Sequence, residues 1–236
     1  MYGSVASMGL MHGGGPYVPV DPDALAYADF VAQVYEIAAG PSSLTALFSG
    51  TDPDGFSVDG MKVAFDNSNR PAATGALKAL IDDGLADGIT LLFEMEMETG
   101  SAGGTLFGVN DADFIEAIWL NSQPGASDQG DMNFGTVSLP MNKPGINRVA
   151  FTLSRDIGGG SFRNAVSVNG SAITGGSGSR WQNLSYALAD RFTGGIAAVT
   201  IGDVSDWDQP NDFEFFRKFA VYAPMDDTAL AALSSL

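Results

Sequence analysis

The carboxy-terminal stretch Phe213-Glu-Phe-Phe-Arg-Lys-Phe-Ala-Val-Tyr222 decides the fold class of this chain. In an extended strand, successive side chains point to opposite sides, so every second residue shares a face. One face then carries Phe213, Phe215, Arg217, Phe219 and Val221. That face is apolar except for Arg217, which predicts a β-strand with one side in a hydrophobic core.

A short helix is expected directly after this strand. Pro224 ends the pairing, and Asp226 or Asp227 can cap the start of a helix. Leu230 and Leu233 then give the helix one apolar stripe. We therefore predict a strand that is followed by a small amphipathic helix over residues 226–234.

This pairing resembles the closing segment of laminin G-like and pentraxin-like domains, which belong to the concanavalin A-like jelly roll. Further motifs carry the resemblance: the alternating strand Arg148–Ser154, the turn Gly158-Gly-Gly160, the strand Val166-Ser-Val-Asn169-Gly170 and the run Ile196–Gly202. Asn-Gly also suits a tight turn, because both residues tolerate positive φ. The resemblance implies a fold, and it covers mainly the last 90 or so residues.

Composition agrees with a mostly β protein. The chain has 236 residues, of which 30 are glycine and 10% are aromatic, and its short apolar runs are separated by Gly, Asn, Asp and Pro. It has 28 acidic and 11 basic residues, a formal charge of −17 that disfavours binding to nucleic acid. With no cysteine, it has neither disulfides nor thiolate metal sites.

The chain is expected to form one jelly-roll β-sandwich with an amino-terminal extension. Residues 1–20 are rich in Gly, Met and Ser, which predicts a flexible arm. The arm either has no role or orders against a partner subunit through Met8, Leu10, Met11 and Tyr17. The start lacks the pattern of a secretory signal, and no apolar run reaches the roughly 20 residues that span a bilayer. We expect assembly in a cytoplasm.

Residues 21–40 are predicted to form a helix, and the sandwich is predicted to occupy residues 41–236. Asp21-Pro22-Asp23 is typical of a helix start, and Gly40-Pro41 would end the helix. Inside the sandwich, residues 76–85 favour a short helix and residues 89–99 a clear strand. Further strands are expected at residues 56–65, 105–109, 114–120, 133–139, 147–154, 165–168 and 196–201.

One constellation of carboxylates could be catalytic. Glu94, Glu96 and Glu98 share one face of the strand at 89–99. Retaining glycosidases with this jelly roll carry a similar Glu, Asp, Glu pattern, and their two working carboxyl groups lie about 5–5.5 Å apart. Here the middle residue is glutamate, and no tryptophan is near in sequence. We favour plain alternation, with the glutamates facing water, and therefore a protein that is not an enzyme.

Two other kinds of site are considered. Calcium is possible at Asp203, Asp206 and Asp208, although these residues match no defined calcium loop. Trp181 and Trp207 lie in polar segments, and together with Arg180 they are candidates for contact with a glycan. The single histidine, His12, cannot form a histidine-clustered metal site.

These observations favour a structural accessory protein of a phage or phage-like particle, either head decoration or a tail component. The amino-terminal segment would anchor it to other virion proteins, and homo-oligomerisation is expected by symmetry. The jelly roll would face outward, where host glycans are possible partners. The alternative is a carbohydrate-binding module or lectin, and the third hypothesis is a glycoside hydrolase that uses the three glutamates.

Overall fold

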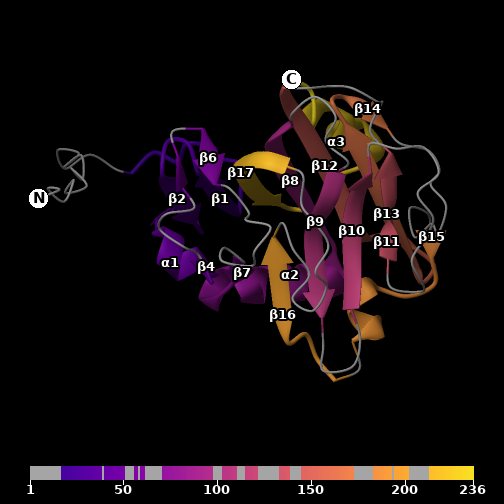
Figure 1. Cartoon of the computed structure of the whole chain (residues 1–236). Helices are drawn as coiled ribbons and strands as arrows, with labels where there is room; N and C mark the ends of the chain where they lie inside the picture. Colours follow the sequence, from indigo (N-terminus) through magenta and orange to yellow (C-terminus); the bar gives the residue numbers. More distant parts are fainter. Residues whose placement is uncertain are drawn as a thin grey trace, which may run out of the picture.

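Two β-sheets pack face to face in this protein (Figure 1), so the prediction of a mostly β sandwich is confirmed. The computed structural model describes residues 17–38, 40–50, 56–57, 59–61, 71–97, 103–110, 115–121, 133–138, 145–172, 183–192, 194–201 and 213–236. Within these residues, no helix is long and apolar enough to span a bilayer.

The large sheet is antiparallel, and its main path runs in the order β14-β13-β12-β8-β17-β1-β2-β3. On this path lie β1 (Ala26–Asp29), β2 (Val34–Ile37), β3 (Gly40–Pro41), β8 (Ile89–Met97), β12 (Gly145–Gly158), β13 (Ser161–Val168), β14 (Ser171–Ala172) and β17 (Phe213–Tyr222). Off the path lie β5 (Phe56–Ser57), β6 (Gly60–Met61) and β15 (Asn183–Leu184). The strand β17, whose alternation predicted the fold class, is thus a central strand.

The small sheet has the order β11-β10-β9-β16-β7-β4. Its strands are β4 (Phe48–Ser49), β7 (Ala72–Ala73), β9 (Gly103–Asn110), β10 (Ile115–Asn121), β11 (Asn133–Ser138) and β16 (Ala198–Ile201). The pair β10 and β11 is parallel, whereas the other pairs are antiparallel. The strands predicted from residue 89 onward are therefore present, with ends that differ by a few residues.

A layer of aromatic rings fills the space between the sheets. Phe93 stacks on Phe151 with ring centroids 5.4 Å apart, and Phe219 lies 5.1 Å from Phe93. Phe107 of the small sheet approaches Phe151 at 5.9 Å. All four side chains are almost completely buried. We call the side of the large sheet that bears these rings its core face, and the opposite side its outer face.

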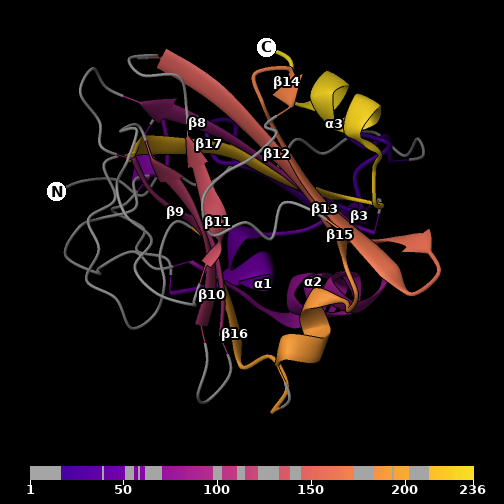
Figure 2. The same cartoon turned by 90° about the vertical axis from the view of Figure 1, so that its right-hand side faces the viewer.

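Short helices complete the sandwich. The 13-residue helix α2 (Gly75–Asp87) confirms the helix predicted at 76–85, and it fills the space between the two sheets at one end (Figure 2). Its Leu77, Ile81 and Leu85 are buried in the core. The remaining helices are α1 (Leu44–Leu47), the 3₁₀ turn η2 (Leu188–Arg191) and α3 (Asp227–Leu233).

The carboxy-terminal helix confirms its prediction closely. Asp226 is the N-cap, and its side chain accepts hydrogen bonds from the backbone N–H groups of Thr228 and Ala229. Leu230 is buried against the outer face of the large sheet. The tight turn predicted at Asn169-Gly170 is also present, with φ of 48° and 79°.

The helix predicted for residues 21–40 is wrong. Residues 26–37 instead form the hairpin of β1 and β2, and β1 pairs with β17 in the large sheet. Ala26 and Ala28 are small enough to fit beside a central strand, and pairing with β17 outweighs their high helix propensity. The sandwich therefore begins before residue 41, and no separate helical segment precedes it among the described residues.

Candidate functional site

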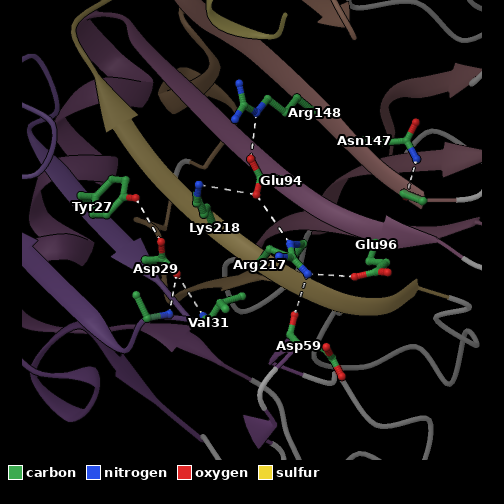
Figure 3. Close-up of polar contacts among 12 residues, drawn as sticks. Tyr27, Asp29, Val31, Asp59, Glu94, Glu96, Asn147, Arg148, Arg217 and Lys218 are labelled. Atoms are coloured by element: carbon green, nitrogen blue, oxygen red, sulfur yellow. Dashed lines mark hydrogen bonds and ion pairs between the residues drawn. The ribbon is translucent and has the colours of Figure 1, made fainter. Parts of the chain in front are cut away.

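Five charged side chains meet near the centre of the outer face of the large sheet (Figure 3). They come from three neighbouring strands, and we call them the charged cluster: Glu94 and Glu96 of β8, Arg148 of β12, and Arg217 and Lys218 of β17. Glu94 lies directly opposite Arg148 in the pair of β8 and β12, and directly opposite Lys218 in the pair of β8 and β17. Opposite charges in such cross-strand positions attract each other.

Arg217 joins this cluster because β17 contains a β-bulge. Phe216 pairs with Met95 and Lys218 with Glu94, so Arg217 is an extra residue without its own partner. The bulge shifts the alternation: Phe216 and Phe219 both face the core, and Arg217 turns to the outer face with Lys218. The predicted face that combined Arg217 with Phe219 is therefore wrong.

A glycine of β6 permits this bulge. Gly60 has φ of +134°, and a Cβ atom there would lie 2.4 Å from the carbonyl oxygen of Phe216. A larger residue would collide with β17 at the bulge. The neighbouring Asp59 accepts a hydrogen bond from Arg217 through its backbone carbonyl, at 3.3 Å.

Glu94 is the buried centre of the cluster, with a side chain only 6% exposed. Its Oε2 accepts a hydrogen bond of 2.8 Å from Arg148 Nε. Its Oε1 lies 3.7 Å from Arg217 Nε and 3.6 Å from Lys218 Nζ. A buried carboxylate is tolerated where cations surround it in this way. The expectation that the glutamates simply face water is wrong for Glu94.

The second glutamate is more exposed. Glu96, with a side chain 33% exposed, accepts a hydrogen bond of 2.9 Å from Arg217 Nη1. Both glutamates are thus bound to cations, and Glu98 lies outside the described residues. A retaining glycosidase needs one carboxylate as a nucleophile and one as an acid. In the charged cluster, the carboxylate oxygens of Glu94 are engaged by cations, which favours a structural or binding role.

The cluster retains capacity to donate hydrogen bonds. Arginine and lysine supply only donors; Arg217 Nε is buried, with no acceptor within hydrogen-bond distance in the described part of the chain, so the accessible donors are those of the other two cations. Lys218 approaches Glu94 at ion-pair distance only, and 31% of its side chain is exposed. Arg148 is equally accessible at 31%. Incoming oxygen atoms can therefore reach the partly exposed donor groups of Arg148 and Lys218.

Tyr27 lies beside the cluster on β1. Its hydroxyl donates a hydrogen bond to Asp29 Oδ2 at 3.4 Å, and Asp29 Oδ1 accepts from the backbone N–H groups of Val31 and Ala32. Burial raises the pKa of Tyr27 above its ordinary value, and the charges of Asp29 and Glu94 raise it further. Its phenol is therefore neutral at physiological pH.

Tyr17 is the one assembly candidate that falls within the described residues. Its hydroxyl donates a hydrogen bond to Glu36 Oε1, and both oxygens of Glu36 accept from the backbone N–H of Val20 at 3.1 Å. Burial, together with the hydrogen bond and charge of Glu36, raises the pKa of Tyr17 to about 12. The contact ties the beginning of the described chain to β2.

Most other candidates lie outside the described residues. These are Met8, Leu10, Met11, Glu98, Arg180, Trp181, Asp203, Asp206, Trp207 and Asp208. Their suggested roles in assembly, glycan contact and calcium binding stay predictions. Within the part of the chain that is described, no group of three or more His, Cys, Asp or Glu side chains could hold a metal ion.

Sequence reasoning missed Arg148 and Lys218 as members of a site. A signal existed, because the chain has only 11 basic residues and these two stand in strands. Lone cations on strands of an acidic protein indicate partners across the sheet. Arg217 was visible as the charge on an apolar face, but a bulge cannot be located from alternation alone.

No protein-family model and no curated protein matches this chain. Solved structures do match at low similarity. A Trypanosoma rangeli sialidase in complex with sialic acid has 14% identity and a TM-score of 0.46, and the match covers 92% of this chain. It covers 34% of the sialidase, so the chain spans about a third of that protein's length.

Two smaller solved structures are similar over most of their own length. The Ruminococcus gnavus IT-sialidase CBM40 has 14% identity and a TM-score of 0.42, covering 65% of this chain and 86% of that one. Domain 4 of an extracellular arabinanase from Geobacillus stearothermophilus, in complex with arabinotriose, has 15% identity and a TM-score of 0.44. This match covers 91% of this chain and 98% of the arabinanase domain. These similarities concern the sandwich fold alone. The finer resemblance to laminin G-like domains and to phage virion proteins stays a prediction.

Proposed function

We propose that this β-sandwich is a carbohydrate-binding domain that holds its ligand on the charged cluster and does not cleave it. The observation that carries this proposal is the row Arg148, Glu94 and Lys218, fixed directly opposite one another on three central strands. The row lies on the sheet face that the small sheet and α2 leave free. Charged groups held by the rigid interior of a sheet make a prearranged recognition surface.

The chemistry of the cluster suits a sugar. A sugar hydroxyl both donates and accepts, and the cluster presents guanidinium and ammonium donors beside carboxylate acceptors. Charge-assisted hydrogen bonds are stronger than neutral ones, so a few of them hold a small polar ligand. Glu96 and Lys218 keep 33% and 31% of their side chains exposed, so both kinds of group are accessible.

Competing functions fit less well. The formal charge of −17 opposes binding to a phosphate backbone, and the three cations of the cluster are balanced in part by two glutamates. The engaged oxygens of Glu94 favour a non-catalytic role over a glycosidase. The neighbours determine which glycans are tested first, since two of them are described in complex with sialic acid and arabinotriose.

The test is a titration of sialylated glycans, arabino-oligosaccharides and β-glucans against the full chain by calorimetry. We expect at least one class to bind and Arg148→Ala to weaken that binding about tenfold, because a hydrogen bond with a charged group is lost. Lys78→Ala is the matched control. Lys78 is a similarly exposed cation, at 26%, but it belongs to α2 and pairs with Asp82 there.

Equal binding by wild type and Arg148→Ala would place the ligand elsewhere, and absence of binding across the panel would refute the proposal. Release of sugar products by the wild-type protein, abolished in Glu94→Gln, would instead support the glycosidase hypothesis. The same samples serve both measurements.

We also propose that the domain is displayed on a phage-like particle that is assembled in the host cytoplasm, and that its amino-terminal segment, residues 1–20, anchors it there. The supporting observation is the contact of Tyr17 and Val20 with Glu36, which fixes where that segment joins the sandwich. Light scattering on the full chain and on a chain beginning at Tyr17 tests this. We expect a closed oligomer that becomes monomeric on truncation, and monomers in both samples would refute anchoring through self-association.

A further inference from the structure

We propose that the carboxy-terminal segment positions Arg148 within the charged cluster, so that ligand affinity depends on the docking of α3. This inference rests on the proposed function and assigns a control element to the same site. The observation behind it is a single hydrogen bond of 2.7 Å, which Arg148 Nη1 donates to the backbone carbonyl of Ser235. The same guanidinium donates to Glu94 through Nε at 2.8 Å.

The beginning of the segment is fixed independently of Arg148. Two buried threonines, Thr90 of β8 and Thr152 of β12, lie 2.8 Å apart through their hydroxyls on the outer face. Thr90 Oγ1 accepts from the backbone N–H of Met225 at 2.9 Å, and Thr152 Oγ1 donates to its carbonyl at 3.1 Å. Leu230 then packs in a small apolar cluster on the outer face. Losing the last residues should therefore leave the start of α3 in place.

The end of the segment is held by the turn between β13 and β14. Ser234 Oγ donates to Ser167 Oγ at 2.9 Å and accepts from the backbone N–H of Gly170 at 3.0 Å. Gly170 has φ of 79°, and a Cβ atom there would lie 2.7 Å from Ser235 Oγ. The Ser235 side chain thus packs close to the turn, and the Ser235 carbonyl lies next to Arg148.

Arg148 itself is held at three points. Its backbone N–H donates to Asn169 Oδ1 at 2.8 Å, which fixes where the side chain begins. Its guanidinium is planar, so two bonds in different directions, to Glu94 and Ser235, fix the plane of the group. Without the Ser235 carbonyl, the guanidinium can rotate about its bond to Glu94. Rotation costs ordering entropy when a ligand binds, and affinity falls.

A chain ending at Leu233 tests this dependence, because it lacks the Ser235 carbonyl and keeps the contacts of Thr90, Thr152 and Leu230. The matched control ends at Ser235 and lacks only the exposed Leu236, so an acceptor for Arg148 remains as a terminal carboxylate. The first readout is the Nε–H signal of Arg148 in a ¹⁵N correlation spectrum, assigned with Arg148→Ala.

We expect this signal to shift and exchange faster with solvent in the chain ending at Leu233, and to stay protected in the chain ending at Ser235. An unchanged signal in the shorter chain would overturn the inference, whatever the glycan results are. This readout needs no ligand, so it separates failure of the positioning role from failure of the proposed function.

The second readout is affinity for the best glycan of the panel. The chain ending at Leu233 should bind about three- to tenfold more weakly, because binding must then order the freed Arg148 side chain. In an Arg148→Ala background, the same truncation should cause no further loss, because its effect passes through Arg148. An equal loss in both backgrounds would show a purely structural effect of the truncation and would overturn the inference.

Discussion

The two faces of β8 are stabilised by different physical means, although their residues alternate along one strand. On the core face, Phe93 and Met95 are completely buried among other apolar side chains. On the outer face, Glu94 is nearly as buried, since only 4% of the whole residue is exposed, but its neighbours are cations from β12 and β17. The core face needs only shape and volume, whereas the outer face needs matched charges at defined positions.

This difference determines how each face responds to change. Apolar packing is non-directional, and its loss scales with the volume removed. In the charged cluster, removal of the Glu94 charge leaves three cations without their shared buried counter-charge. Four changes to the protein, in order of decreasing effect, test this contrast.

The largest effect is expected for Phe93→Ala on the core face. Phe93 contacts the rings of Phe151, Phe216 and Phe219, and the cavity left behind should lower the free energy of unfolding by about 3–5 kcal/mol. Urea denaturation measures the change. Ile157→Ala is the control, because Ile157 is 42% exposed and should change stability by less than about 0.5 kcal/mol. Similar losses in both variants would contradict the assigned core.

Deletion of Ala220 should have the next largest effect, because removing one residue from a strand turns the side chains that follow to the opposite face of the sheet. Without Ala220, Val221 and Tyr222 exchange faces, which should cost about 3 kcal/mol as apolar and polar groups change places. Deletion of Arg217 is the matched control. It removes the bulge, leaves Phe216 and Lys218 on their present faces, and should cost about 1 kcal/mol or less through the lost ion pairs with the two glutamates.

Equal losses for these two deletions, measured by thermal and urea unfolding, would contradict the bulge. The Arg217 deletion also sharpens the functional question. It removes one cation from the charged cluster while β17 regains regular alternation from Phe215 onward.

On the outer face, Glu94→Gln should destabilise the protein by about 2 kcal/mol, since three cations lose a buried counter-charge whose partners are themselves partly exposed. Glu96→Gln should cost about 0.5 kcal/mol, because its pair with Arg217 is more exposed. Urea denaturation at low and at high salt distinguishes them. A smaller loss for Glu94→Gln than for Glu96→Gln would contradict the central place of Glu94.

The same contrast explains what the sequence predicted well. Alternation of apolar residues identified β8, and the cap at Asp226 with the apolar spacing after it identified the helix α3. Both are local signals in the sequence. The tight turn at Asn169-Gly170 is local in the same sense, since its backbone conformation suits those two residues. These elements need no knowledge of the rest of the fold.

Failures occurred where distant segments decide the structure. The hairpin of β1 and β2 had helical spacing, yet β1 pairs with β17, whose residues follow about 190 positions later in the sequence. The burial of Glu94 depends on Arg148 and Lys218, whose registers cannot be derived from composition. The bulge at Arg217 depends on Gly60 of β6. The charged cluster is thus a tertiary feature, and sequence indicated only its glutamates.

The smallest expected effect concerns tyrosines and high pH. Burial raises the pKa of Tyr222 above its ordinary value of 10.0, and the hydrogen bond it donates to Asp21 raises it further. Burial also raises the pKa of Tyr35 to about 12, with a contribution from the charge of Asp29. Tyr222 belongs to the apolar cluster of the outer face, whereas Tyr35 packs against the core.

Above pH 10, the unfolded chain loses tyrosine protons that the folded chain keeps, so the free energy of unfolding falls as pH rises. Tyr222→Phe should cost about 1 kcal/mol at pH 8, through the lost hydrogen bond, and should also flatten the decline between pH 10 and 11. Tyr35→Phe should flatten the decline while costing less at pH 8. Urea denaturation across this range tests both. A decline of equal slope in wild type and both variants would show that charges other than these phenols control alkaline stability. The difference in stability between the two variants at pH 8 measures what the hydrogen bond of Tyr222 adds to burial. It therefore compares a polar contact on the outer face with apolar packing against the core.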